Sequence, residues 1–65
     1  MKITCKSSDS EYPEVFESLE ALERELRLSA DDDYADNVLG QSKAGATVVR
    51  VANGPRDTDT YTVEQ

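Results

Sequence analysis

A leucine stripe in residues 18–28, SLEALERELRL, constrains the fold of this chain more than any other feature. Leu19, Leu22 and Leu26 recur at the spacing that places apolar side chains on one face of an α-helix. Ser18 directly precedes the stripe and is a good N-cap, and Glu20 falls in the first turn, where the helix dipole favours a carboxylate. The segment therefore predicts an amphipathic helix with a charged outer face.

A second, shorter helix is predicted where the chain reads SADDDYADNVLGQ, residues 29–41. Ser29 is the expected N-cap, and the aspartates at 31, 32 and 33 then occupy the first turn, where free backbone N–H groups stabilise negative charge. Gly40 stands where a C′ glycine commonly ends a helix. Apolar residues at intervals of four supply the buried face, in the sets Ala30, Tyr34 and Val38, and Ala35 and Leu39.

Three segments are typical of half-buried strands, because apolar residues alternate along residues 2–6 (KITCK), 46–52 (ATVVRVA) and 59–64 (DTYTVE). The last two flank NGPRDT, whose Asn-Gly and Pro favour a turn, so we expect an antiparallel hairpin. Asp57 and Asp59 are interpreted as part of the turn or its flank. Residues 7–14, SSDSEYPE, are expected to form a loop, since Pro13 disfavours helix at the preceding residue.

Together these elements predict an α+β fold in the order β-α-α-β-β, a three-stranded antiparallel sheet with one long and one short helix packed on one face. With 65 residues the chain is a single small domain, residues 1–65. A domain near this size buries only about 60% of the surface that its unfolded chain exposes, which leaves little room for a deep substrate cleft. The expected core is Ile3, Cys5, Phe16, Leu19, Leu22, Leu26, Tyr34, Val38, Leu39, Val49, Val51, Tyr61 and Val63.

The residue types exclude most catalytic and metal chemistry. The chain has no histidine and a single cysteine, Cys5, which excludes Ser-His-Asp and Cys-His catalysis and an internal disulfide, and leaves a cysteine-based zinc site without ligands. Asp31 and Asp33 match the first two positions of a calcium loop, but Ala35 and Asp36 stand where a ligand and the turn glycine belong. We therefore expect a non-catalytic protein without cofactor or metal.

The charge of the chain is unevenly distributed. Eleven acidic residues and two arginines lie within residues 9–36, a net charge of −9, whereas the remaining residues carry a net charge of +2. The helical half is thus strongly acidic, and the outer face of the predicted sheet, with Lys2, Lys6 and Arg50, is mildly basic. Carboxylates along a helix are spaced by a few ångströms, on the order of the phosphate spacing along DNA. A rigid row of them can therefore occupy a basic groove that normally holds nucleic acid.

The overall charge also indicates which partners to expect. A net charge of −7 repels nucleic acid and anionic membranes and attracts basic protein surfaces. Basic residues are too few for direct nucleic-acid binding, and no apolar run approaches the roughly 20 residues of a membrane span. The polar start MKITCKSSD lacks the features of a signal peptide. We expect a cytoplasmic protein whose partner is a basic protein surface.

In size, acidity and lack of catalytic residues, the chain resembles the small proteins with which phages disarm host defences, including anti-CRISPR proteins and DNA mimics. The acidic segments EYPEVFESLEALERE, residues 11–25, and SADDDYAD, residues 29–36, carry this resemblance. It covers the whole chain in general character and rests on no specific motif. It implies an inhibitor that binds a CRISPR effector complex in the host cytoplasm and blocks target DNA.

The side chains expected to pair with lysines and arginines of such a partner are Glu20, Glu23, Asp31, Asp32, Asp33 and Asp36. Two alternatives remain open. The acidic surface can serve only solubility, in a small structural or regulatory domain of a halophilic or otherwise acidic proteome. The chain can also be a homodimeric subunit that pairs through the exposed edge of the strand at 46–52, although we favour a monomer.

Overall fold

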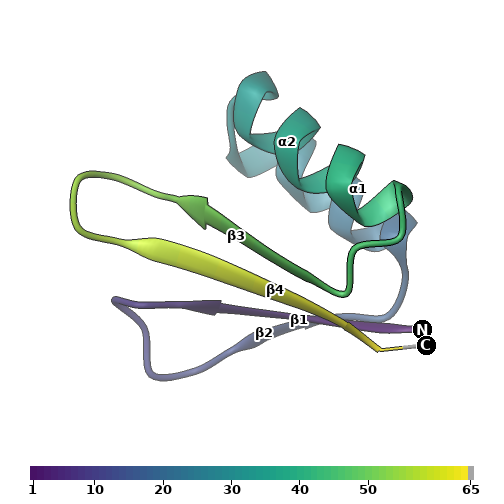
Figure 1. Ribbon diagram of the computed structural model, residues 1–65, viewed down its shortest axis with the longest axis horizontal. Helices are drawn as coiled ribbons and strands as arrows, with labels where there is room; N and C mark the ends of the chain where they lie inside the picture. Colours follow the sequence, from purple (N-terminus) through teal and green to yellow (C-terminus); the bar gives the residue numbers. More distant parts are fainter. Residues whose placement is uncertain (65) are drawn as a thin grey trace.

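A computed structural model, which describes residues 1–64, places four strands in one antiparallel sheet with two helices on one side of it (Figure 1). The strand order across the sheet is β2-β1-β4-β3, so the first and last strands of the chain lie at its centre. The α+β class and the two helices are confirmed, and the sheet has four strands rather than the expected three. The elements are β1 (Lys2–Ser7), β2 (Glu14–Phe16), α1 (Leu19–Ser29), α2 (Asp32–Lys43), β3 (Val48–Ala52) and β4 (Thr58–Glu64).

The additional strand is β2, which begins at the end of the segment that was expected to be a loop. It pairs antiparallel with β1, with Phe16 opposite Ile3 and Glu14 opposite Cys5. Three residues are too few to show the alternation by which a strand is recognised in a sequence. β2 is the strand at one edge of the sheet. It carries Phe16 and Glu14 on the same face as Ile3 and Cys5.

The hydrophobic core fills the space between this sheet face and the helices. Ile3, Leu22, Val38 and Val49 are completely buried, and the register sets Ile3 beside Val63 of β4. Every residue of the expected core is buried or packs partly buried against it, and the small side chain of Ala35 joins them. The opposite sheet face is uncovered by helices (Figure 1).

α1 begins and packs as its leucine stripe predicts. The Ser18 hydroxyl caps the helix by accepting a hydrogen bond from the backbone N–H of Ala21 at 3.1 Å, and Leu22 and Leu26 are buried. Leu28 lies off the stripe and is 80% exposed. None of the described helices is long and apolar enough to cross a membrane.

The limits of α2 differ from the prediction at both ends. Ser29 is the last residue of α1, and the N-cap of α2 is Asp31, whose carboxylate accepts from the Tyr34 N–H at 2.8 Å. Gly40 lies inside α2, which continues to Lys43.

The glycine that ends α2 is Gly45, which has a φ of +100°. The N–H of Gly45 donates to the carbonyl of Ser42, and the N–H of Ala46 donates to that of Gln41. This pair of bonds is the Schellman motif, in which a residue with positive φ closes the helix. Ala46 then packs against the core and leads the chain into β3.

Candidate functional site

The six acidic residues proposed to bind a partner all lie on α1, on α2 or in the connection between them. Asp31, Asp32 and Asp33 cap and open α2, and Asp36 follows one turn later. Glu20 lies in the first turn of α1. At a rise of about 1.5 Å per residue, it is roughly 15 Å from the other end of that helix, where the connection to α2 begins. The structure therefore gathers the aspartates at one end of the helix layer and leaves Glu20 towards the other.

Arg27 binds three of these six acids together. Its guanidinium lies 3.3 Å from the Asp32 carboxylate, 2.8 Å from that of Asp36 and 4.0 Å from that of Glu23. The Glu23 carboxylate also lies 3.6 Å from the Lys43 ammonium. The hydrogen bond to Asp36 raises the pKa of Arg27. We call Arg27, Glu23, Asp32 and Asp36 the Arg27 cluster. It joins α1 to α2 and neutralises part of the surface that sequence reasoning treated as uniformly acidic.

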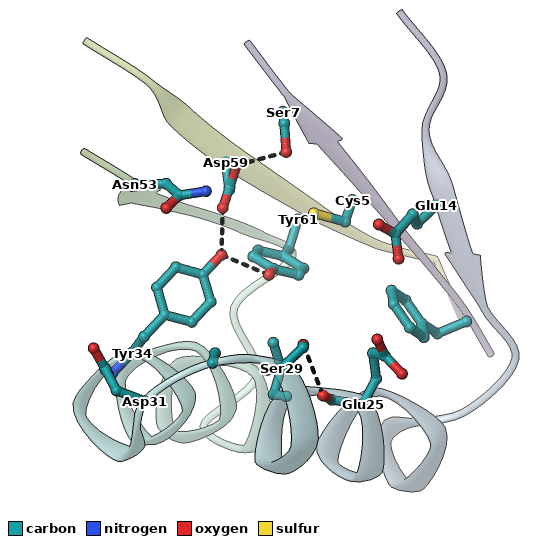
Figure 2. A pocket seen from close by; sticks show the side chains of 13 residues that line it. Cys5, Ser7, Glu14, Glu25, Ser29, Asp31, Tyr34, Asn53, Asp59 and Tyr61 are labelled. Carbon is teal, nitrogen blue, oxygen red and sulfur yellow. Dashed lines mark hydrogen bonds between the residues drawn. The ribbon is translucent and has the colours of Figure 1, made fainter. Parts of the chain in front are cut away.

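A pocket of about 460 Å³ opens between the α1–α2 connection and the sheet (Figure 2). Five elements and two connections contribute to it, and the acidic residues among its lining are Glu14, Glu25, Asp31 and Asp59. Among residues 1–64, no lysine or arginine lines it. We call it the acidic pocket. Its lining residues are Cys5, Ser7, Glu14, Phe16, Glu25, Leu26, Ser29, Ala30, Asp31, Tyr34, Asn53, Asp59 and Tyr61.

Asp59, at the base of the acidic pocket, is a buried carboxylate held by hydroxyl groups. It is only 4% exposed. Its Oδ1 accepts from the Ser7 hydroxyl and its Oδ2 from the Tyr34 hydroxyl, both at 2.6 Å. These distances lie in the range of about 2.5–2.7 Å that is typical of a hydroxyl bound to an ionised oxygen. The β1–β4 register, with Ser7 opposite Asp59, brings the first pair together.

The network continues from Tyr34 to Tyr61, whose hydroxyl oxygens are 2.7 Å apart. A phenol has one proton, and that of Tyr34 is used for Asp59, so the Tyr61 hydroxyl is the donor to Tyr34. The rings meet edge to face, with centroids 6.5 Å apart. The sequence predicts Tyr34 as a core residue. Its ring packs against the core, and its hydroxyl also ties α2 to the sheet.

The pKa values of three pocket groups, Tyr34, Tyr61 and Cys5, are raised. Burial raises the pKa of Tyr34, and its hydrogen bond to Asp59 raises it further, because the phenolate would face a carboxylate. Burial likewise raises the pKa of Tyr61 and of the Cys5 thiol. The phenols and the thiol therefore remain protonated near neutral pH, and the thiol is a poor nucleophile.

Sequence reasoning missed Asp59, which was interpreted as part of a turn or its flank. The signal was present, because Asp59, Tyr61 and Val63 alternate along one strand and must face the same way. It also missed Glu14 and Glu25 as pocket residues, and no local pattern could have placed them together. Of the six predicted residues, only Asp31 lines the pocket.

The arrangement offers several hydrogen-bond acceptors and no basic group, so it is suited to holding a cation rather than an anion. Within residues 1–64 no three histidine, cysteine, aspartate or glutamate side chains converge as metal ligands. The oxygen atoms that line the pocket can accept hydrogen bonds from a donor group that enters it. No protein-family model matches the chain, and comparisons with curated proteins and with solved structures gave no match.

Proposed function

We propose that this protein is a non-catalytic inhibitor that acts in the host cytoplasm by binding a basic, nucleic-acid-binding surface of a defence complex, such as a CRISPR effector. The observation that carries the proposal is the concentration of acidic side chains on one rigid layer. Glu20, Glu23, Asp31, Asp32, Asp33 and Asp36 all project from α1, α2 and their short connection.

Two features support a role for this layer in binding. The helices that carry the acids are anchored to the sheet by buried Leu22, Leu26 and Val38, so the carboxylates are held in place before a partner arrives, which reduces the entropy cost of association. Among the described residues, Glu20, Asp31 and Asp33 have no ion-pair partner, so their charges are available to a basic surface.

The test is capture of basic proteins by the immobilised protein from a nuclease-treated host lysate, followed by elution with duplex DNA and, separately, with salt. A mimic of DNA competes with DNA, so a captured target should be released by the duplex and by rising salt. The variant Asp31→Ser, Asp32→Asn, Asp33→Asn keeps a good N-cap at position 31 and should lose the target. Arg27→Gln removes the neutralising guanidinium and should retain the target to higher salt.

A matched control separates local from global charge. The variant Asp9→Asn, Glu11→Gln, Glu64→Gln removes the same number of charges at positions outside α1 and α2, and it should capture the target as the unmodified protein does. The proposal is wrong if the two triple variants behave alike, or if duplex DNA fails to displace what is bound.

A further inference from the structure

We infer that the acidic pocket receives one basic side chain, an arginine or a lysine, of the protein that the acidic layer contacts. This inference rests on the proposed function, because it assigns a single anchoring residue of the basic partner to a defined place on this chain. The pocket lies beside Asp31, the cap of α2, and is therefore continuous with the acidic layer.

The first argument is the unbalanced charge of Asp59. Buried carboxylates in proteins are normally paired with a cation or a metal, yet within residues 1–64 the partners of Asp59 are the neutral hydroxyls of Ser7 and Tyr34. A carboxylate offers about four acceptor positions, and these bonds occupy two of them. Asp59 also lines the pocket, so an entering cation would meet a carboxylate whose described partners are neutral.

The second argument is the shape and chemistry of the walls. The volume of about 460 Å³ lies within the roughly 300–1,000 Å³ of small-ligand sites. Phe16 and Leu26 supply apolar surface for the methylene stem of a basic side chain. The ring of Tyr61 offers an aromatic edge or face beside the charged group.

The third argument is the distribution of acids around the space. Figure 2 shows the carboxylates of Glu14 and Glu25 on the side of the pocket away from Tyr34, and Asp59 on the side next to it. Glu14 comes from β2 and Glu25 from α1, so the two flank the space from opposite layers. A planar guanidinium with five donors, or an ammonium with three, can address acceptors on both sides at once.

The experiment titrates the full-length protein with the blocked tripeptide acetyl-Gly-Arg-Gly-amide and follows backbone amide shifts by NMR. Matched tripeptides carry lysine, or citrulline, which has the shape of arginine but no charge. The arginine peptide should shift the amides of pocket residues, the lysine peptide should do the same more weakly or comparably, and citrulline should not. Cys5 lines the pocket and gives a second readout, since bound arginine peptide should slow further the already slow alkylation of its thiol by excess iodoacetamide.

Variants locate the binding. Glu14→Gln with Glu25→Gln changes two exposed side chains and should preserve the fold. It should weaken binding of the arginine peptide by about tenfold or more, the effect of losing hydrogen bonds to charged groups. Asp59→Asn should weaken it similarly. The control, Glu20→Gln with Asp33→Asn, removes equal charge outside the pocket and should leave the affinity within about twofold.

The inference is overturned if citrulline binds as arginine does, if shifts spread over the whole helix layer, or if the pocket pair and the control pair weaken binding equally. This outcome is distinguishable from failure of the proposed function, because the tripeptide needs no protein partner. Loss of peptide binding with retained, DNA-competed capture of a basic protein refutes only the pocket. Peptide binding without such capture refutes only the inhibitor.

Discussion

At the scale of single residues, Asp59 of β4 makes one hydrogen bond within the sheet and one to the helix layer. Its two hydroxyl partners come from different elements, Ser7 from β1 and Tyr34 from α2. Truncation of the carboxylate would leave two half-buried donors without an acceptor, and an unsatisfied donor costs about 1–3 kcal/mol when it is fully buried. The residue thus contributes to the fold and also holds the charge at the base of the pocket.

We predict that Asp59→Ala lowers the free energy of unfolding by roughly 2–4 kcal/mol. That is a large fraction of the roughly 3–10 kcal/mol expected for a chain of this length. Urea denaturation followed by circular dichroism measures the loss. Asp59→Asn, which retains an acceptor, should lose less, and Asp9→Ala in the exposed loop should change little. Equal losses for Asp59→Ala and Asp9→Ala would contradict the assigned network.

The tyrosines predict a loss of stability at alkaline pH. Because the pKa values of Tyr34 and Tyr61 are raised in the folded state, the unfolded chain releases these protons first. Their stabilising contribution is therefore complete below the ordinary tyrosine pKa of about 10 and is lost as the pH rises above it toward the folded values.

Thermal unfolding at increasing pH, in a Tyr12→Phe background, checks this sign. The melting temperature should fall above pH of about 10, and tyrosinate absorbance should appear together with unfolding. Absorbance that rises at the ordinary tyrosine pKa while the circular dichroism of the fold persists would show that the two phenols are not protected.

At the scale of elements, two glycines close together in the chain have opposite roles. Gly40 lies within α2, where an added Cβ would meet no atom within 4 Å, and the flexibility of glycine there costs about 0.5–1 kcal/mol relative to alanine. Gly45 has the positive φ that closes the helix, a conformation in which a side chain is strained.

We therefore predict that Gly40→Ala stabilises the protein by about 0.5–1 kcal/mol, whereas Gly45→Ala destabilises it by about 1 kcal/mol. The pair is internally controlled, since both changes add the same methyl group. Chemical denaturation of the two variants side by side gives both values. The reverse order would mean that α2 ends at Gly40, as the sequence had led us to expect.

Long periodic elements were predictable because their pattern repeats. The Leu19, Leu22 and Leu26 stripe fixed α1 and its Ser18 cap, and alternation fixed β1 and the β3–β4 hairpin. Where a feature is local, several residues compete for one role: Asp31 and Ser29 are both good caps, and Gly40 and Gly45 both permit a helix end. Tertiary packing decides between them.

The site was less predictable than the fold. Sequence spacing placed the aspartates on one helix start, but the neutralising position of Arg27 depends on how α1 packs on α2. The acidic pocket depends on β2, a strand too short to recognise, and on the pairing of Ser7 with Asp59 across β1 and β4. Such contacts join residues far apart in the chain, and no local pattern encodes them.

At the scale of the whole molecule, the net charge of −7 acts against self-association. β3 is an edge strand and could pair with a second copy, but each chain would bring its excess negative charge to the dimer. We predict that native mass spectrometry and small-angle scattering give a single chain at low salt. A dimer that persists at low salt would favour the edge-paired alternative.

The pairing of Lys2 with Glu64 places both described ends of the chain together at one margin of the sheet (Figure 1). Ser7 and Asp59, at the base of the acidic pocket, pair at the other end of the same two strands, roughly 17 Å away at about 3.4 Å per residue. A purification tag, a fluorescent reporter or a surface tether attached near Lys2 or Glu64 therefore lies far from Asp59 at the base of the pocket. A short peptide joining the two ends would yield a circularised version of the protein.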